Sequence, residues 1–473
     1  MALADKKTFI IYRKSPAALQ NIFTSAYGLR KCFFERADEL RTRLRELDRT
    51  QWLDIDSLRQ IQSEKLRELV QYAYREIPYY RRLFDQRGLN PGQIQDLSDL
   101  NRIPLLTRED IKAHADLLCH PQALRKKRWS QSTSGTTGSP LKVFLDKTVI
   151  WAERAWIWRH RSWGGLDFRN SRRSRHWRGT FGGHPIVPFN HRKGPFWRVN
   201  VPGKQIHFST YHMTAAHLDR YVEKIQKQNV RFIDGYPSTI FILARFLRTR
   251  GLKLPMKAVF TGAEPLYPHQ RRVIEEVFGP RVFDYYGLTE KVASAGECDQ
   301  HGGLHVNMED TIVEIIAGND RTDGGTEGEI VGTSLVNYTM PLLRYRTGDV
   351  STFRQERCPC GRELALIEPV ETKVEDIITT RDGRFISASN LTYAFKPLTH
   401  IGESQIIQED VDRIVVRVVA GDGYCRADEQ RLVQGLQEKL GARMNIAIER
   451  VDHIPRTPTG KFRFTISKVP FEL

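Results

Sequence analysis

Hydrophobic residues recur at helical spacing in the first part of the chain. Five of them lie three or four residues apart, which places them on one face of a helix: Leu66, Leu69, Val70, Ala73 and Ile77. Pro78 follows and should end this helix. Thr107, three residues before Asp110, is typical of a helix N-cap with an acid in the first turn. We therefore predict that residues 1 to about 95 are helical.

After about residue 128 the pattern changes to short apolar runs that alternate with helix-like stretches. The runs are Phe232–Ile233, Ala258–Phe260 and Val282–Phe283, and each ends in turn residues. Helix-like periodicity occupies 218–228, 240–250 and 269–278. This alternation predicts a mostly parallel sheet flanked by helices, in which ligands lie at the carboxyl ends of the strands.

The last third of the chain has a different pattern of hydrophobic and polar residues. Residues 328–343 are strand-like without helices, which predicts a β-rich subdomain, and Arg413–Ala420 predicts a further strand followed by a helix over 428–440. The fold class expected is therefore α/β, with a small α+β domain at the C-terminal end. We place the helical leader at 1–95, as part of a large N-terminal domain that continues over 96–371, and the C-terminal domain at 372–473.

The composition is that of a folded globular protein, with 473 residues, 40% of them hydrophobic and 27% charged. No apolar run approaches the length that spans a bilayer, and the N-terminal residues lack the apolar stretch of a signal peptide. Six cysteines are too few for a disulfide framework in so long a chain. These features predict a cytoplasmic protein.

Positive charge is concentrated in one segment. The net charge is +17, and residues 154–198 hold eleven Lys or Arg against one acid, Asp167, together with most of the tryptophans. Basic residues mixed with aromatics suit nucleic acid, an anionic lipid surface or a polyanionic small molecule. The alternative is a solvated face whose tryptophans point inward. No nucleic-acid-binding signature accompanies the segment, so we expect no specific nucleic-acid partner and keep a peripheral anionic surface as one reading of 154–198.

A loop rich in hydroxyls and glycine is the most informative stretch. It consists of Ser132, Thr133, Ser134, Gly135, Thr136, Thr137 and Gly138. Its glycines allow a tight turn, and its hydroxyl and N–H groups can surround phosphate oxygens. The Walker pattern is absent, which argues against a P-loop NTPase, and the nucleophile elbow is absent, which argues against a hydrolase.

Three further motifs make this signal specific. Tyr286-Gly287-Leu-Thr289-Glu290 follows a predicted strand, Tyr345-Arg-Thr-Gly-Asp349 follows the β-rich stretch, and Pro458-Thr-Gly-Lys461 lies near the C-terminus. The four motifs, in this order, resemble the core motifs of the adenylate-forming superfamily. The resemblance covers essentially the whole chain. It is strongest to phenylacetate–CoA ligases and CapK-like proteins, through Ile77-Pro-Tyr-Tyr80, Gly262-Ala-Glu-Pro-Leu266 and Cys358-Pro-Cys-Gly-Arg362.

The resemblance implies a role for each motif. The 132–138 loop would grip the β- and γ-phosphates of ATP, Thr289 would hydrogen-bond the α-phosphate, and Glu290 would hold Mg²⁺, which prefers oxygen ligands. Asp349 would accept the ribose hydroxyls. Lys461 would bridge the carboxylate and the α-phosphate in the transition state, so we assign it a catalytic role with Thr289 and Glu290.

The remaining site residues also follow from the resemblance. Four residues would frame the adenine: Ala263, Glu264, Tyr285 and Tyr286. Tyr236, Ala263 and Gly287 are our candidates for the acyl pocket. The hinge departs from the family pattern, because Lys373 stands where an arginine is usual, and Glu375 takes the hinge position. The C-terminal domain would rotate about that hinge between the two half-reactions.

The cysteines and histidines suggest a second site. Cys298 and His301 form a Cys-x2-His pair, and Cys358 and Cys360 form a Cys-x-Cys pair. Together they supply the four ligands of a structural zinc site, with His305 as an alternative ligand. The alternative is that Cys298 and His301 are ordinary loop residues.

The function expected is that of an ATP-dependent, AMP-forming ligase similar to phenylacetate–CoA ligase. It would adenylate a small-molecule carboxylic acid and pass the acyl group to an acceptor, with coenzyme A first and an amine or hydroxyl as the alternative. The cofactors implied are ATP, Mg²⁺, structural Zn²⁺ and coenzyme A. A rival of another class is a non-catalytic nucleotide- or polyanion-binding protein. Glu290, Asp349 and Lys461 argue against that rival, since a sensor has no need of the lysine.

Overall fold

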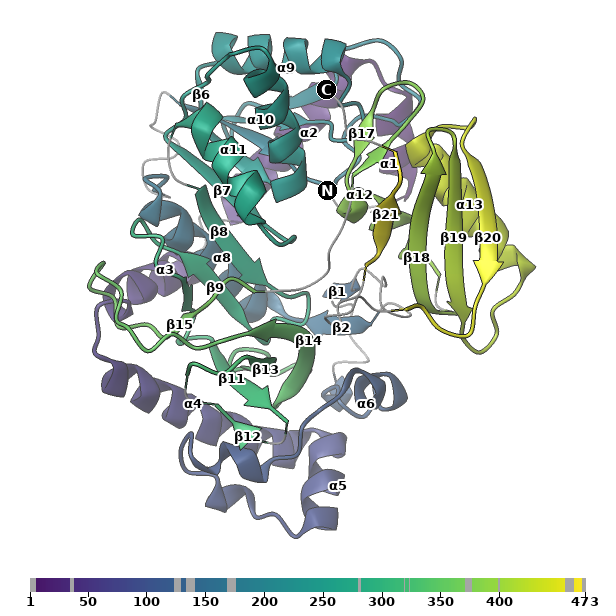
Figure 1. The fold of residues 1–473 in the computed structure, drawn as a ribbon. Helices are drawn as coiled ribbons and strands as arrows, with labels where there is room; N and C mark the ends of the chain where they lie inside the picture. Colours follow the sequence, from purple (N-terminus) through teal and green to yellow (C-terminus); the bar gives the residue numbers. More distant parts are fainter. Residues whose placement is uncertain are drawn as a thin grey trace.

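The fold is that of a computed structural model (Figure 1). It describes eleven segments of the chain: 6–34, 38–122, 129–132, 141–167, 176–279, 282–318, 320–322, 324–370, 377–398, 400–455 and 463–469.

The leader is helical, as its periodicity predicts. Its helices are α1 (Lys6–Lys14), α2 (Ala17–Phe34), α3 (Asp38–Thr50), α4 (Ile55–Glu76) and α5 (Pro78–Arg87), followed by short 3₁₀ turns at Pro91–Gln93 and Asp99–Arg102. Helix α4 ends before Pro78, which becomes the first residue of α5. Thr107 caps α6 (Arg108–Ala113) in a reciprocal capping box with Asp110. Both helix boundaries predicted from the sequence are confirmed.

A nine-stranded sheet forms the centre of the molecule (Figure 1). Its order is β15-β10-β9-β8-β7-β6-β3-β5-β4, and neighbours among β3, β6, β7 and β8 run parallel. The strands are β3 (Trp177–Phe181), β4 (Trp197–Asn200), β5 (Gln205–Phe208), β6 (Val230–Gly235), β7 (Ala258–Gly262), β8 (Val282–Gly287), β9 (Ser294–Glu297), β10 (Leu304–Val306) and β15 (Leu366–Ile367). The predicted α/β class is confirmed, but the sheet is mixed rather than mostly parallel. Four of its eight neighbouring pairs are parallel, and the pairs β15–β10, β10–β9, β9–β8 and β5–β4 are antiparallel.

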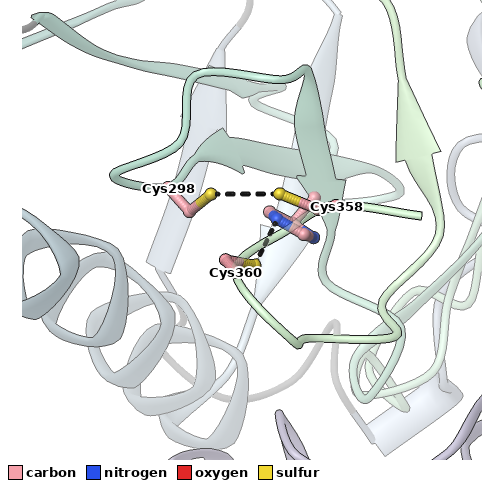
Figure 2. Close-up of side chains that lie close together, drawn as sticks. Cys298, Cys358 and Cys360 are labelled. Atoms are coloured by element: carbon pink, nitrogen blue, oxygen red, sulfur yellow. Dashed lines mark hydrogen bonds between the residues drawn. The ribbon is translucent and has the colours of Figure 1, made fainter. Parts of the chain in front are cut away.

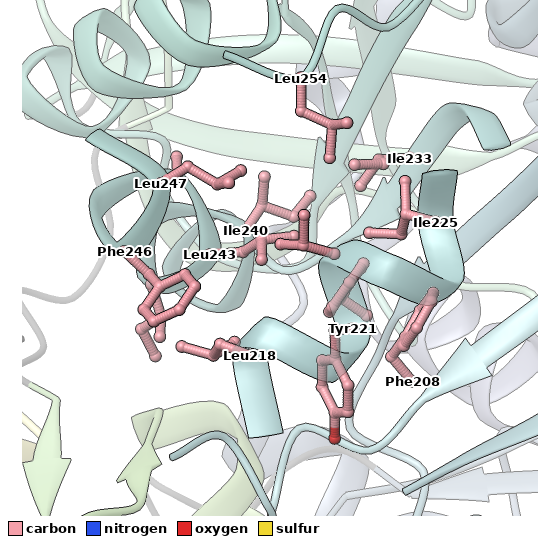
Figure 3. Packing of buried hydrophobic residues seen from close by; sticks show 14 of the residues in the cluster. Phe208, Leu218, Tyr221, Ile225, Ile233, Ile240, Leu243, Phe246, Leu247 and Leu254 are labelled. Atoms are coloured by element: carbon pink, nitrogen blue, oxygen red, sulfur yellow. The ribbon is translucent and has the colours of Figure 1, made fainter. Parts of the chain in front are cut away.

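Helices cover both faces of this sheet. Successive strand residues point to opposite faces, so Ile233 packs with α9 (Ala215–Lys227), α10 (Pro237–Thr249) and α11 (Pro268–Phe278). Its neighbour Phe232 packs on the other face with α3 and α8 (Lys147–Trp163). Figure 3 shows the first of these cores, where Leu218 and Tyr221 of α9 meet Leu243 of α10 over the sheet. These two apolar layers hold the strand ends in place.

The β-rich part lies beside the large sheet. Its four strands are β12 (Asp320–Arg321), β11 (Thr311–Ala317), β13 (Gly328–Ser334) and β14 (Tyr345–Ser351), in that spatial order. The predicted β-rich subdomain is confirmed, and within the strand-like stretch 328–343 the strand β13 ends at Ser334. Beyond it, the Asn337 side chain accepts hydrogen bonds from the backbone N–H groups of Thr339 and Met340, and this local turn competes with a strand.

The C-terminal segment begins with a short hairpin and a helix. The hairpin strands are β16 (Ile378–Thr379) and β17 (Phe385–Ile386), and the helix is α12 (Ala388–Phe395). A four-stranded sheet follows, in the order β20-β19-β18-β21, with α13 (Arg426–Leu440) packed on it. Its strands are β18 (Ile401–Asp410), β19 (Arg413–Ala420), β20 (Asn445–Arg450) and β21 (Thr465–Ser467). A separate two-stranded ribbon is formed by β1 (Trp129–Ser132) and β2 (Lys142–Leu145).

Much of the basic, tryptophan-rich segment is internal. Three tryptophans of α8 are buried, namely Trp156, Trp158 and Trp163. Arg159 is fully buried and pairs with both carboxylate oxygens of Glu309, at 2.5 and 3.1 Å. Arg161 and Arg178 pair with Asp234. These three arginines and the buried Arg198 support the alternative that many side chains of residues 154–198 point into the protein. Four more of its arginines lie in 168–175, outside the described residues.

Within the described segments, none of the helices combines the length and apolar character needed to cross a bilayer.

Candidate functional site

The carboxyl ends of four parallel strands align at one edge of the large sheet. Their register places Phe181 of β3 beside Gly235 of β6, Gly235 beside Thr261 of β7, and Thr261 beside Asp284 of β8. The residues that follow these positions are therefore neighbours at that edge. They include Tyr236, Ala263, Glu264 and Tyr286, which the sequence analysis assigns to the nucleotide and acyl pockets.

Close approach of a neighbouring carbonyl or side chain favours glycine at two positions of this edge. A Cβ added to Gly235 would lie 2.3 Å from the carbonyl oxygen of Phe181, and one added to Gly287 would lie 2.5 Å from the Tyr285 hydroxyl. Ala263 is exposed and has a φ of 67°, in the left-handed region that a non-glycine residue rarely adopts. Strained backbone of this kind concentrates at ligand sites, so Ala263 supports a binding role for the turn after β7.

Two of the predicted motifs meet through a side-chain hydrogen bond. The Tyr286 hydroxyl at the end of β8 donates to Oδ2 of Asp349 on β14 over 2.9 Å. Burial is the main factor that raises the pKa of Tyr286, and the nearby Asp349 carboxylate raises it further. The tyrosine therefore stays a donor at neutral pH and holds the Asp349 carboxylate in a defined orientation.

Glu290 lies in the turn after β8, where only 5% of its surface is exposed. The Tyr345 hydroxyl donates to its Oε1 over 3.3 Å. Burial raises the pKa of Glu290, while the charges of Arg108 and Lys291 oppose that shift. A bound cation would favour the ionised carboxylate in the same way. Tyr345 begins the motif that contains Asp349, but Arg108 was not expected at this site, because its proximity depends on how α6 packs beside β14.

A second group of polar side chains surrounds Glu264. Its Oε2 accepts from the backbone N–H of Ser238 at the start of α10, over 3.2 Å. Burial raises the pKa of Glu264, and the hydroxyls of Ser238, Ser389 and Ser387 oppose the shift. Helix α12 also brings Tyr393 beside Tyr236, and its proximity contributes to the raised pKa of Tyr236, of which burial is the main cause.

This group leaves several buried polar atoms without a direct hydrogen bond among the described residues. They are Oε1 of Glu264, the hydroxyl oxygens of Ser238 and Ser387, and Oδ1 of Asn390. The sequence analysis singled out Glu264 and Tyr236 but none of the α12 residues. No local motif marks them, since they reach the site only through the packing of the C-terminal segment on the large sheet.

Several predicted site residues lie outside the described segments. They are Thr133 to Gly138 of the hydroxyl-rich loop, Lys373, the hinge residue Glu375 and Lys461. Ser132, at the start of the loop, is the last residue of β1, and Thr289 lies in the turn beside Glu290.

Three cysteines and one histidine converge at a separate site (Figure 2). The possible ligand atoms of Cys298, His305, Cys358 and Cys360 all lie within 4.8 Å of one another. Sγ of Cys298 is 3.5 Å from Sγ of Cys358, and Sγ of Cys360 is 3.4 Å from Nε2 of His305. Tetrahedral zinc with ordinary bond lengths separates its ligand atoms by about 3.5–3.8 Å. The Cys298–Cys358 and Cys360–His305 pairs therefore have the spacing of neighbouring ligands in a tetrahedral metal centre.

The surroundings of these sulfur atoms also suit a metal. Backbone N–H groups of Gln300 and Arg362 point at Sγ of Cys298 and Cys360, each over 3.4 Å, and such donors stabilise thiolates. Hydrogen bonding with Cys298 is the main factor that lowers the pKa of Cys360 far below its usual range, and His305 and Arg362 add to the effect.

The histidine of this cluster is His305, and the prediction of His301 as its member is wrong. In the β9–β10 pair, His305 stands opposite Gly296, on the sheet face that Cys298 shares by strand alternation. His301 lies in the turn between these strands. Its Nδ1 is 3.7 Å from Oε2 of Glu297, and its ring packs against Phe283. His305 was the alternative ligand in the sequence analysis, and the pairing register decides between the two.

The chain is similar to CapK and to phenylacetate-coenzyme A ligases. Residues 378–468 match the family model of the CapK C-terminal domain. Protein CapK of Staphylococcus aureus is 26% identical over 470 residues, which cover 97% of this chain and 99% of that protein. A phenylacetate-coenzyme A ligase of Thermus thermophilus is 24% identical over 446 residues, covering 86% and 96%.

Solved structures show the same fold. A 2-hydroxyisobutyryl-CoA ligase in complex with 2-HIB-AMP and CoA, in its thioesterification state, matches with a TM-score of 0.55 and 21% identity, over 89% of this chain and 91% of that one. The same ligase in a postadenylation state matches with a TM-score of 0.53 and 19% identity, over 89% and 92%. The chain is thus similar to CapK and to phenylacetate-coenzyme A ligases over most of its length, matches the model of the CapK C-terminal domain over residues 378–468, and shares the fold of the 2-hydroxyisobutyryl-CoA ligase.

Proposed function

We propose that the protein is an ATP-dependent, AMP-forming ligase that activates a carboxylic acid and transfers the acyl group to coenzyme A. The observation that carries this proposal is the hydrogen bond from Tyr286 to Asp349, beside the buried Glu290. It joins two motifs, 63 residues apart in the chain, at the carboxyl ends of the strands where a nucleotide would bind. The relatives named CapK and phenylacetate-coenzyme A ligase support it over nearly the whole chain.

In the first half-reaction, a carboxylate oxygen attacks the α-phosphorus of ATP and pyrophosphate leaves. Asp349, oriented by Tyr286, would accept the ribose hydroxyls, and Thr289 would donate to the α-phosphate. Glu290 would hold Mg²⁺, which supplies positive charge against the phosphates. Lys461 would bridge the two anions that react, and residues 132–138 would hold the β- and γ-phosphates.

In the second half-reaction, the thiolate of coenzyme A attacks the carbonyl carbon of the acyl-adenylate and AMP leaves. We propose that residues 372–473 form the mobile domain that changes position between the two steps, about Glu375. The polar side chains that α12 brings against Glu264 lie where this domain meets the large one. Their contacts with Glu264 would therefore be replaced by others when the domain moves. Coenzyme A and ATP are cytoplasmic metabolites, so the activity implies a cytoplasmic site of action.

We further propose that Cys298, His305, Cys358 and Cys360 hold one structural zinc ion. The ion would tie the β9–β10 hairpin to the 358–360 loop, next to β8 and its nucleotide motif. Four protein ligands leave no open coordination position, so the ion has no direct part in the chemistry.

Carboxylate-dependent exchange of pyrophosphate into ATP tests the first half-reaction. The assay is run with aromatic, fatty, amino and sugar acids, and a Lys461→Ala variant serves as the blank. Exchange with one class of acid would establish adenylation and identify the substrate class. If ATP binds but no acid supports exchange, the protein either transfers AMP to a hydroxyl or has a binding role, and the proposed acyl ligase is wrong.

Addition of the acceptor tests the second half-reaction. Coenzyme A should convert the acyl-adenylate to a thioester, which mass spectrometry detects. Product formed only with an amine or a hydroxyl compound would keep the adenylation step and replace the acceptor.

A further inference from the structure

The α1–α2 hairpin exposes most of the large hydrophobic side chains on the described surface. Nine such side chains are exposed among the described residues, and six of them belong to this hairpin: Ile10, Ile11, Leu19, Ile22, Tyr27 and Leu29. The most exposed are Ile22 at 64%, Ile11 at 56% and Ile10 at 53%. Single exposed apolar residues are ordinary, but a cluster of this kind marks a surface that binds something.

Helix α2 turns its polar side toward the protein. Gln20 and Thr24 are buried, and Oε1 of Gln20 accepts from Nε of the buried Arg198 over 2.6 Å. Oδ1 of Asn21 accepts from the backbone N–H of Val199 over 2.9 Å, and the Ser25 hydroxyl donates to the Val199 carbonyl over 3.1 Å. These contacts give hydrogen-bond partners to backbone groups on the free edge of β4, the last strand of the large sheet.

The opposite side of α2 is apolar and faces outward. Leu19, Ile22, Ala26 and Leu29 are exposed at spacings of three, four and three residues, which forms one stripe along the helix. The exposed side chain of Val201 belongs to a residue beside α2, because the Val201 backbone N–H donates to Ser25 over 3.2 Å. A helix that buries its polar face and exposes its apolar face presents the pattern expected of a helix with a further partner on the outside.

The charge of the hairpin indicates the kind of partner. Residues 6–34 contain six cations, Lys6, Lys7, Arg13, Lys14, Arg30 and Lys31, and no Asp or Glu. Arg13, Lys14 and Arg30 are exposed, so they flank the apolar surface at both ends of the hairpin. An apolar face accompanied by cations, with no acid within residues 6–34, is the composition of helices that lie in the interface of an anionic bilayer.

We propose that the α1–α2 hairpin docks the protein on an anionic membrane surface. Its exposed isoleucines and leucines enter the boundary between headgroups and acyl chains, and its lysines and arginines contact lipid phosphates. A second copy of the chain is the rival occupant. Two such hairpins would bring twelve cations together without one acid to offset them, which disfavours self-association through this face.

Flotation of the full chain with lipid vesicles tests the proposal. Vesicles of phosphatidylglycerol mixed with phosphatidylcholine are compared with vesicles of phosphatidylcholine alone, at low and at high salt. The protein should bind the mixed vesicles, bind the neutral ones at least about tenfold more weakly, and lose affinity as salt rises. Equal binding to both vesicle types, or no binding to either, overturns the proposal.

Substitutions test whether the hairpin is the surface that binds the vesicles. Ile22→Glu should lower the partition coefficient by more than about tenfold, because it replaces an apolar side chain that would enter the lipid with a charged one. Lys14→Glu should lower it roughly fivefold or more. The matched controls are Leu252→Glu and Lys253→Glu, at exposed positions outside the hairpin, which should bind like the unsubstituted chain.

Thermal unfolding and pyrophosphate exchange of the variants separate loss of membrane binding from loss of folding or activity. All four variants should retain the thermal unfolding temperature and the pyrophosphate exchange of the unsubstituted chain, which separates this surface from the proposed ligase site. If Ile22→Glu binds the mixed vesicles as well as the unsubstituted chain does, the hairpin is not the docking surface. If sedimentation shows a dimer that Ile22→Glu dissociates, the occupant is a second copy.

Discussion

Removal of one hydroxyl group isolates the contact that joins the two nucleotide motifs. In Tyr286→Phe the ring keeps its apolar packing, but the donor to Oδ2 of Asp349 is lost. The carboxylate is then free to rotate away from the orientation in which we expect it to receive the ribose hydroxyls. The change should therefore weaken ATP binding more than it slows the chemical step.

The size of the effect follows from the contact. A hydrogen bond to a charged group contributes about 1.5–3 kcal/mol, and the Tyr286–Asp349 bond has the 2.9 Å length of a well-formed one. If all of that free energy serves to orient Asp349 for the nucleotide, KM for ATP rises by about tenfold to a hundredfold. Because the hydroxyl does not touch the reacting atoms in this account, kcat should change by less than about threefold.

Pyrophosphate exchange at varied ATP concentration measures both parameters. Tyr74→Phe is the matched control, because its hydroxyl also donates to an aspartate, Asp85, over 3.0 Å, but at an exposed position between α4 and α5. The control should leave KM unchanged. If Tyr286→Phe also leaves KM for ATP unchanged while the protein remains folded, the reasoning that Tyr286 positions Asp349 for the nucleotide is refuted.

Three further predictions concern the metal, the backbone and pH. His305→Asn should reduce zinc from about one ion per chain to near zero in metal analysis, whereas His301→Asn should retain it, and the reverse result would contradict the assigned ligand set. Gly287→Ala should lower the free energy of unfolding in denaturant by about 1–3 kcal/mol, because its Cβ would lie 2.5 Å from a tyrosine hydroxyl. The control Gly182→Ala, whose Cβ would have its nearest neighbour at 4.0 Å, should lower it by less than about 1 kcal/mol. Similar losses in the two variants would show that Gly287 is not crowded. Burial raises the pKa of Asp284 to about 6, above its value in the unfolded chain. This carboxyl therefore contributes up to about 3 kcal/mol of stability at low pH, which is lost as pH rises through about 6. Asp284→Asn should flatten the dependence of the unfolding free energy on pH between about 4 and 6.

The sequence predicts the sheet and its binding edge because the signals are local. Short apolar runs that end in glycine, such as the one before Gly235, mark strands whose carboxyl ends must share an edge once the sheet is parallel. Helix boundaries at Pro78 and Thr107 are likewise set by the conformational limits of single residues. Tyr286 and Asp349 could be paired from the sequence only through the resemblance of their motifs.

What the sequence does not predict depends on contacts between distant segments. The choice between His301 and His305 rests on where each lies in the β9–β10 hairpin: His305 is paired with Gly296 within the strands, whereas His301 lies in the turn. A register shift of one residue would turn His305 to the other face of the sheet. The polar residues of α12 reach Glu264 only through domain packing. An amphipathic pattern shows that α2 has two faces, but it does not show that Gln20 turns inward to meet Arg198.

If the protein forms an acyl-adenylate, one oxygen of the carboxylate must be transferred to AMP. The acid identified by pyrophosphate exchange is supplied with isotopically labelled carboxylate oxygens, together with ATP and coenzyme A, and the nucleotide product is examined by mass spectrometry. We predict AMP that carries one labelled oxygen, because the oxygen that attacks the α-phosphorus leaves with AMP when the thiolate attacks the carbonyl carbon. ADP as the product, or AMP without label, would contradict the account.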